Sequence, residues 1–295
     1  MQVAPSVRFP LAVLYVLGVT ALAHAEDKPA VDLKMGMLQG MFRDVQPAMV
    51  QALSKPFREL VYKQTGFTGD VDLCPDALTL IEKLKDKKLQ IGVFHGHEFA
   101  WAQKQCPDLV PIVVTIPPGG KAQSMIVVNL DCKAKTVAEL VDDPVTMPRG
   151  AKAYSLMFLD KCHAGLGKSV AKPITKKSMN TEDLLNAVVL GEVTAALVDA
   201  STLDGYQTLQ PGAFKQLKIL AKSDMFPPAV VAYRKGSISE DDAEKIRKGL
   251  TSANQTASGK LLMTLWNLKG LEEPPADYQQ KLDAILKAYP CPEIK

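Results

Sequence analysis

Two patterns of apolar residues alternate along residues 31–290: short runs rich in β-branched residues, and longer runs with apolar positions three and four residues apart. The first pattern predicts strands and the second predicts amphipathic helices. We expect strands over 31–38, 71–74, 89–94, 109–116, 124–129, 145–147, 170–175, 195–198, 217–221 and 229–233. We expect helices over 46–63, 76–87, 97–105, 136–141, 152–162, 180–190, 256–268, 275–289 and from Ser239 onward. This alternation favours an α/β fold with mainly parallel sheets covered on both faces.

Two proline-rich breaks divide the pattern. Pro117-Pro118-Gly119-Gly120 stands near the middle of the chain, and Pro227-Pro228 follows about 110 residues later. We interpret the breaks as two crossings between lobes, which predicts lobe one over 26–120 plus 230–295 and lobe two over 121–229. Two lobes joined by paired crossings close on a ligand between them. In such sheets the ligand lies beyond the C-terminal strand ends, where helix N-termini supply N–H groups.

The first 25 residues have the composition of a secretory signal. Arg8 is the only charged residue before Glu26, and an apolar run over 11–23 is followed by Ala23-His24-Ala25. A positive start, a short apolar centre and an A-x-A site are typical of a cleaved signal peptide. A run of this length is too short to span a bilayer comfortably. We therefore predict a cleaved secretory signal peptide and export of the mature chain, with an uncleaved N-terminal anchor as the alternative.

The overall composition excludes several classes of protein. With 47% apolar and 23% charged residues, the chain is neither disordered nor a coiled coil overall. Its 35 basic and 32 acidic residues give a net charge of +3, too balanced to predict a nucleic-acid partner. No GxSxG, HExxH, Walker or dinucleotide-binding motif is present, so we expect neither an enzyme nor a cofactor.

Five cysteines occur after the signal-like segment. In an exported protein, disulfides are the default expectation, and an odd count leaves at least one thiol unpaired within the chain. Proximity within the predicted lobes suggests Cys74 with Cys106 and Cys132 with Cys162. The absence of a CxxC motif argues against a thioredoxin-like site or a zinc ribbon.

Several segments occur in an order that matches a known family. They read LQIGVFHGHEFAWA, GGKAQSMIVVN, LLNAVVLGEVTAALVDASTLDGY and SDMFPPAVVAYRKG. In this order the chain resembles the phosphate/phosphonate-type periplasmic binding proteins of ABC transporters, which have the type II bilobal fold. The resemblance covers nearly all of 31–290. It implies reversible capture of a small ligand for delivery to a membrane permease.

One stretch departs from the family pattern. Phosphonate binders of the family carry a turn close to STSGY at a helix N-terminus in lobe two, and the matching stretch here is Gly150-Ala151-Lys152-Ala153-Tyr154. The hydroxyl side chains are absent, which puts phosphonate itself in doubt. Backbone N–H groups and the helix dipole still favour an anion there. Arg149 and Lys152 supply positive charge in place of the hydroxyls.

His95-Gly96-His97 follows a predicted strand and begins a predicted helix, which is where a ligand would lie. Either His95 or His97 is a candidate ligand contact, because imidazole donates or accepts hydrogen bonds and imidazolium attracts anions. The alternatives are a polar turn and helix cap, or a metal site. A metal site needs a third ligand, which the sequence does not offer at a recognisable spacing.

Five further residues are candidate ligand contacts at strand ends or crossings. Gln39 and Gly40 follow the first strand, and Gln123 and Ser124 follow the first crossing. Asp199 ends a strand in the acidic turn that the resemblance assigns to the cleft; its alternative role is a helix cap for the turn that contains Ser201. Tyr154 and Trp101 are candidate walls of the pocket, although ordinary packing is the more common role of such residues.

The sequence therefore predicts a periplasmic solute-binding protein that captures a small oxyanion of phosphonate or phosphate type. We expect a monomer whose partners are that small anionic ligand and an ABC-transporter permease. The alternatives are a periplasmic sensor or metal-associated binding protein on the same fold, and an enzyme on the same scaffold.

Overall fold

The computed structural model describes residues 33–42, 55, 58–59, 61–62, 66–140, 145–164 and 179–291. The predicted signal peptide, the predicted strand over 170–175 and most of the predicted helix over 46–63 lie outside these residues. No helix in the described part of the chain is long and apolar enough to cross a membrane.

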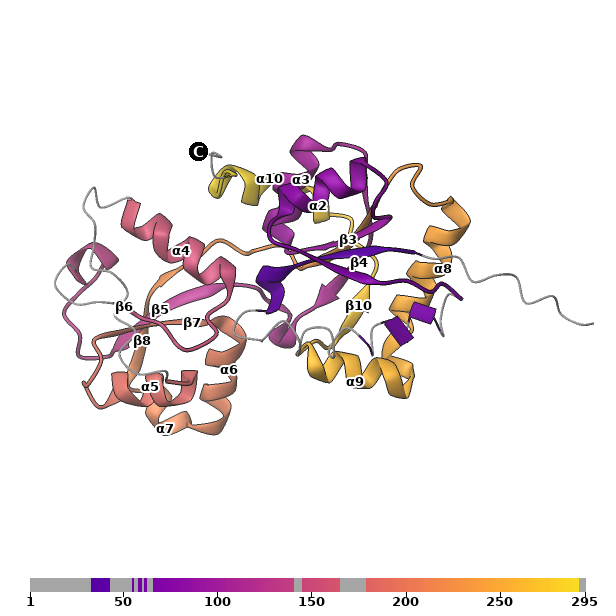
Figure 1. The fold of residues 1–295 in the computed structure, drawn as a ribbon. Helices are drawn as coiled ribbons and strands as arrows, with labels where there is room; N and C mark the ends of the chain where they lie inside the picture. Colours follow the sequence, from indigo (N-terminus) through magenta and orange to yellow (C-terminus); the bar gives the residue numbers. More distant parts are fainter. Residues whose placement is uncertain are drawn as a thin grey trace, which may run out of the picture. The chain divides into compact units, whose positions relative to one another are not determined.

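The first sheet, of which Figure 1 labels β3, β4 and β10, has the strand order β10-β4-β9-β3-β1-β2. Its strands are β1 (Met35–Leu38), β2 (Val71–Cys74), β3 (Ile91–Phe94), β4 (Leu109–Ile116), β9 (Val230–Arg234) and β10 (Gly270–Glu272). Its helices are α2 (Ala77–Lys85), α3 (Gly96–Gln105), α8 (Glu240–Thr251), α9 (Ala257–Leu265) and α10 (Tyr278–Ala288). A short 3-10 helix, η1 (Gln39–Phe42), follows β1.

Both faces of the first sheet are covered, as the alternation of buried side chains along β9 demonstrates. Val230 and Ala232 belong to one buried cluster, which includes residues of α2, α3 and α10. Val231 and Tyr233 belong to another, which includes residues of α8 and α9. Successive side chains of a strand point to opposite faces, so the two clusters lie on opposite sides of the sheet.

The second sheet has the strand order β6-β7-β5-β8. Its strands are β5 (Ser124–Asn129), β6 (Val145–Thr146), β7 (Ala195–Asp199) and β8 (Leu217–Lys222). Its helices are α4 (Ala153–Ala164), α5 (Thr181–Val189), α6 (Ala200–Leu209) and α7 (Pro211–Phe214), with a 3-10 helix, η3 (Val137–Leu140). One buried cluster includes residues of α5 and α6. The other includes residues of α4 and η3. The two sheets confirm an α/β fold with two lobes.

The prediction of mainly parallel sheets was wrong. β1 pairs in parallel with β2 and β3, and β6 with β7. The other strand pairs described are antiparallel: β5 lies between β7 and β8, β9 lies between β3 and β4, and β10 pairs with β4. Each inserted strand is the first one after a proline-rich break and runs against both neighbours. The alternation of strands and helices carries no information about strand order, so it does not reveal these insertions.

The predicted disulfides are absent, because all five cysteines are free. The Cys106 thiol donates to the Asp108 carboxylate at 2.8 Å, and burial is the largest of the causes that raise its pKa to about 11. Cys74 is fully buried in the same cluster, where burial raises its pKa as well. Cys132 and Cys162 pack against the cluster of α4 and η3. These thiols therefore act as small apolar side chains.

Candidate functional site

Three parallel strands of the first sheet end level with one another. Met37 pairs with both Leu73 of β2 and Val93 of β3, and Leu38 pairs with Cys74. The residues that follow these strands therefore line one edge, where η1, α2 and α3 begin. The ligand side of an α/β sheet is this C-terminal edge, so the lobe-one half of the candidate site lies here.

In the second sheet, the corresponding edge is where β7 ends at Asp199. Asp199 pairs across the sheet with Ser124, the first residue of β5. The Asp199 carboxylate caps α6: it accepts from the Thr202 N–H at 3.2 Å, from the Thr202 hydroxyl at 2.8 Å and from the Ser201 hydroxyl. The alternative role as a helix cap is therefore present, whether or not Asp199 also faces a ligand.

Lys152 joins two helix starts. Its carbonyl accepts the first backbone bonds of α4, from Ser155 at 3.0 Å and Leu156 at 3.3 Å. Its ammonium lies 3.5 Å from Asp199 Oδ1 and 5.7 Å from the centroid of the Tyr154 ring. Burial alone would raise the pKa of Asp199, but Lys152 and the capping donors outweigh it and hold that pKa below its ordinary value. Asp199 is thus ionised with its charge compensated.

His97 is the centre of a buried aromatic cluster. Only 3% of the residue is exposed. Its ring stacks on that of His95, with the ring centroids 5.6 Å apart. It makes T-shaped contacts with the rings of Trp101 and Phe226, at centroid distances of 5.1 Å and 5.9 Å. Burial, with His95 close by, lowers the pKa of His97 to about 3. His97 is therefore neutral at physiological pH and contributes ring surface rather than positive charge.

Phe226 connects this cluster to lobe two. Its ring lies 5.1 Å from that of Tyr154 in α4 and 4.8 Å from that of Tyr289, which follows α10. Contacts therefore run without a gap from His95 through His97 and Phe226 to Tyr154, then to Lys152 and Asp199. Sequence reasoning missed Phe226, because one aromatic residue beside two prolines does not indicate which rings it meets.

Glu98 is a second residue that sequence reasoning missed. It lies in the first turn of α3, and its carboxylate accepts a hydrogen bond from the backbone N–H of His95. Burial is the main reason that its pKa is raised to about 7, and the Asp76 carboxylate adds to that rise. A glutamate in a first helical turn is common, so the sequence gives no sign that this one is buried.

Gln123 and Ser124 are used inside the protein. The Gln123 amide donates to the Ser223 carbonyl at 2.8 Å, and the Ser124 hydroxyl donates to the Ser155 hydroxyl at 2.8 Å. Ser124 is completely buried. Both residues therefore support the site rather than offer free donors.

Gln39, Gly40 and Arg149 are the remaining predicted contacts. Gln39 and Gly40 are exposed in η1, and Arg149 is exposed one residue before Gly150, whose φ of 72° turns the chain into α4. Within the described residues, no hydrogen bond, ion pair or ring contact joins the Gln39 or Arg149 side chain to the other candidates, and Gly40 has only its backbone to offer. They flank the site at strand and helix ends.

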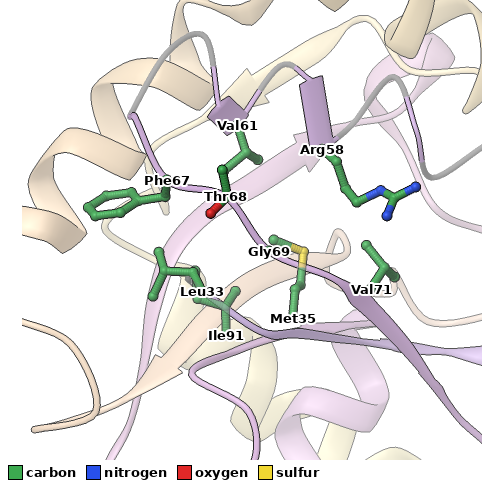
Figure 2. Close-up of a pocket in the computed structure, with 9 residues that line it drawn as sticks. All are labelled: Leu33, Met35, Arg58, Val61, Phe67, Thr68, Gly69, Val71 and Ile91. Carbon is green, nitrogen blue, oxygen red and sulfur yellow. The ribbon is translucent and has the colours of Figure 1, made fainter. Parts of the chain in front are cut away.

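Two pockets of the described structure lie away from these residues. One, lined by Leu33, Met35, Arg58, Val61, Phe67, Thr68, Gly69, Val71 and Ile91, has a cavity volume of about 10 Å³ (Figure 2). That volume holds one water at most. A surface groove of about 340 Å³ lies between α3 and α10. Among the described residues, no group of three His, Cys, Asp or Glu side chains is placed to hold a metal ion.

Comparison with known proteins places the chain in a family. The model of the family described as ABC transporter, phosphonate, periplasmic substrate-binding protein matches residues 40–278. The chain therefore belongs to this family of transporter substrate-binding proteins, which are not enzymes. The match confirms the resemblance and the prediction of a binding protein rather than an enzyme. The search of curated proteins finds no match.

Solved structures support the same fold at low identity. A binding-protein component of an ABC phosphonate transporter from Pseudomonas aeruginosa is 15% identical, with 87% and 85% of the two chains covered and a TM-score of 0.55. PhnD1 from Prochlorococcus marinus, in complex with methylphosphonate, is 12% identical, with 87% of this chain and 97% of PhnD1 covered and a TM-score of 0.56. A Xanthomonas citri protein bound to chloride is 14% identical over 88% and 97%, with a TM-score of 0.60. At these identities the likeness establishes the fold alone.

Proposed function

We propose that this protein captures a small oxyanion of phosphonate or phosphate type and presents it to the permease of an ABC transporter. Family membership supports the transport role. We further propose that a cleaved signal peptide over residues 1–25 delivers the protein to the periplasm, that it acts as a monomer, and that the lobes comprise 26–120 plus 230–295 and 121–229.

The observation that carries the ligand class is the meeting of two helix starts at Lys152. The first N–H groups of a helix have no acceptor within it, so those of Ala153 and Tyr154 favour an anion. Lys152 has three N–H donors, and Asp199 occupies only part of that capacity. Because Ser201, Thr202 and Lys152 compensate its charge, Asp199 orients the ammonium without strongly repelling an oxyanion.

The lobe-one half supplies the opposing contacts. His95 lies at the N-cap position of α3, directly after β3, and Gln39 and Gly40 follow β1 at the same edge. Ligand capture favours a closed state only if the ligand contacts both lobes better in that state. We therefore assign His95 with Gln39 and Gly40 to one side, Lys152 with Arg149 to the other, and His97, Tyr154, Gln123 and Ser124 to the supporting walls.

Titration calorimetry with methylphosphonate, phosphite and phosphate tests this function. We expect at least one of them to bind, and Lys152→Ala to weaken its binding 10- to 100-fold, since a hydrogen bond to a charged group contributes about 1.5–3 kcal/mol. Lys245→Ala is the matched control, because it also breaks a lysine–aspartate ion pair, but in α8. Absence of binding by all three anions would refute the ligand class. Equal affinity of Lys152→Ala and wild type would refute the assigned site.

A further inference from the structure

We infer that Ser155 is a positioning residue. Its hydroxyl, bonded to that of Ser124, holds the N-terminus of α4 against the two crossings between the lobes. An anion that binds at this N-terminus therefore also moves the crossings, which form the hinge of the two lobes. This inference rests on the proposed function for its ligand. It assigns a role to buried hydroxyls that make no ligand contact themselves.

The two crossings are bonded to each other before they reach lobe one. The Phe226 N–H donates to the Ala122 carbonyl at 2.8 Å, and the Ser223 N–H donates to the Ser124 carbonyl at 2.9 Å. In return, the Ser124 N–H donates to the Ser223 hydroxyl at 2.9 Å. Gln123 adds the side-chain bond to the Ser223 carbonyl described above. Residues 122–124 and 223–226 therefore move as one paired segment.

Helix α4 holds this paired segment at three points. In its first turn, the Ser155 hydroxyl accepts from the Ser124 hydroxyl at 2.8 Å, and the Tyr154 ring packs on Phe226. Two turns later, the Lys161 ammonium lies 2.9 Å from the Asp224 carboxylate and 4.4 Å from the centroid of the Tyr289 ring. Displacing the N-terminus of α4 therefore displaces residues 223–226.

Pro227, which directly follows the paired segment, is fitted closely against lobe one. A Cβ at Gly96, the first residue of α3, would lie 2.2 Å from the Pro227 carbonyl oxygen and 2.7 Å from the Pro227 Cβ. Pro227 and Pro228 both have a fixed φ, so movement of residue 226 passes into the crossing with little local bending. The route from the ligand side of α4 to the hinge thus consists of direct contacts.

Burial makes the serine pair sensitive to mutation. Ser124 and Ser155 are 0% and 3% exposed, and Ser223 is 5% exposed. A buried hydroxyl that loses its partner is not easily satisfied by water. Ser155→Ala removes the acceptor of this hydrogen bond without adding volume. Helix α4 should therefore still form, but without its side-chain bond to Ser124 of β5.

Small-angle scattering combined with calorimetry tests the inference in the full-length mature protein. Saturation with whichever of methylphosphonate, phosphite and phosphate binds should reduce the radius of gyration of the wild-type protein. Ser155→Ala should bind the same anion about five- to tenfold more weakly and contract less even at saturation, which a merely stabilising role would not produce. Ser124→Ala removes the donor instead and should behave alike. The double variant should be no weaker than either single one.

Ser237→Ala is the matched control, because it removes a serine bond to the Gln90 carbonyl within lobe one. It should contract fully. Full contraction of Ser155→Ala and Ser124→Ala at saturation would overturn the inference.

A ligand-free measurement separates this inference from the proposed function. Hydrogen exchange of the Ser124 and Phe226 amides should be faster in Ser155→Ala than in Ser237→Ala. If none of the anions binds wild type but exchange changes in this way, the ligand class fails while the tie to the hinge stands. If these amides exchange at the wild-type rate, the tie itself is refuted.

Discussion

The two halves of the proposed site differ in chemical character. The lobe-two half is polar: Lys152 and Asp199 form an ion pair between the starts of α4 and α6. In the lobe-one half, the neutral His97 ring packs against Trp101 and against Phe226 of the second crossing. Under the proposed function we therefore expect a division of labour, in which the lobe-two half binds charge and the lobe-one half provides a rigid surface that also holds the crossing.

The strongest test of this division is Phe226→Ala. Phe226 is 4% exposed and meets three other rings, so truncation should cost about 3–5 kcal/mol in the free energy of unfolding. Phe158→Ala, which removes an equally buried ring from the core of lobe two, should cost a similar amount. Only the first should also reduce contraction on adding ligand. Urea unfolding and scattering measure both effects, and identical contraction in the two variants would contradict a role of the cluster in the hinge.

A second test concerns the contact of α3 with the crossing. Gly96→Ala should destabilise the protein by about 3 kcal/mol, since the new methyl would meet the Pro227 backbone. Gly40→Ala, where the added atom meets nothing within 4 Å, should leave the free energy of unfolding within about 0.5 kcal/mol of wild type. Urea unfolding of the two variants measures the difference. Equal stabilities would show that the crossing is not held against α3.

A third test concerns the buried carboxyl of the lobe-one half. Because the pKa of Glu98 is raised from 4.5 to about 7 in the folded protein, the folded state favours the protonated form. Wild type should therefore lose stability as pH rises from about 4.5 to 7. Glu98→Gln, which keeps an acceptor for the His95 N–H, should avoid this loss. The difference in free energy of unfolding between Glu98→Gln and wild type should therefore shift in favour of the variant by about 2–3 kcal/mol between pH 4.5 and pH 8.

Urea unfolding at both pH values checks this prediction. Glu82→Gln, which changes an exposed carboxyl in α2, should track wild type at both. A constant difference between Glu98→Gln and wild type across pH would mean that Glu98 ionises normally.

The smallest expected effect is at Lys161. Its ion pair with Asp224 is half exposed, so Lys161→Ala should cost at most about 1 kcal/mol, part of it from the contact with the Tyr289 ring. Lys281→Ala breaks a similarly exposed ion pair with Asp277, the residue that precedes α10. It should cost less than about 0.5 kcal/mol. Urea unfolding measures both losses of stability. Equal losses in the two variants would exclude an added contribution from the Tyr289 ring.

Much of the local structure could be predicted from the sequence. The strands over 109–116 and 124–129 have the expected ends. The helix expected over 180–190 occurs as 181–189. These elements are set by periodicity, capping residues and the proline breaks, all of which act over a few residues. The short strand at Gly270–Glu272 and helix α6 were not predicted, because a three-residue pattern and a helix directly joined to a strand give weak periodic signals.

The candidate site was predicted less completely. The sequence placed His95, His97, Lys152 and Asp199 at strand and helix ends, which is where the structure has them. It did not indicate that Asp199 would be compensated by Lys152, or that His97 would be buried and neutral. It gave no sign of Glu98 or Phe226. Burial and the charge of neighbours decide these properties, and both depend on which distant segments pack together.

By itself, the sequence determined the α/β composition, the two-lobed division and the family resemblance, because apolar periodicity and proline breaks are written along the chain. Only the tertiary structure decided the insertion of β5 and β9, the free cysteines and the serine bonds between α4 and the crossings. These features join residues up to about 140 positions apart, as in the pairing of Ile91 with Tyr233. The energy of such contacts comes from packing and desolvation in three dimensions, which no local pattern encodes.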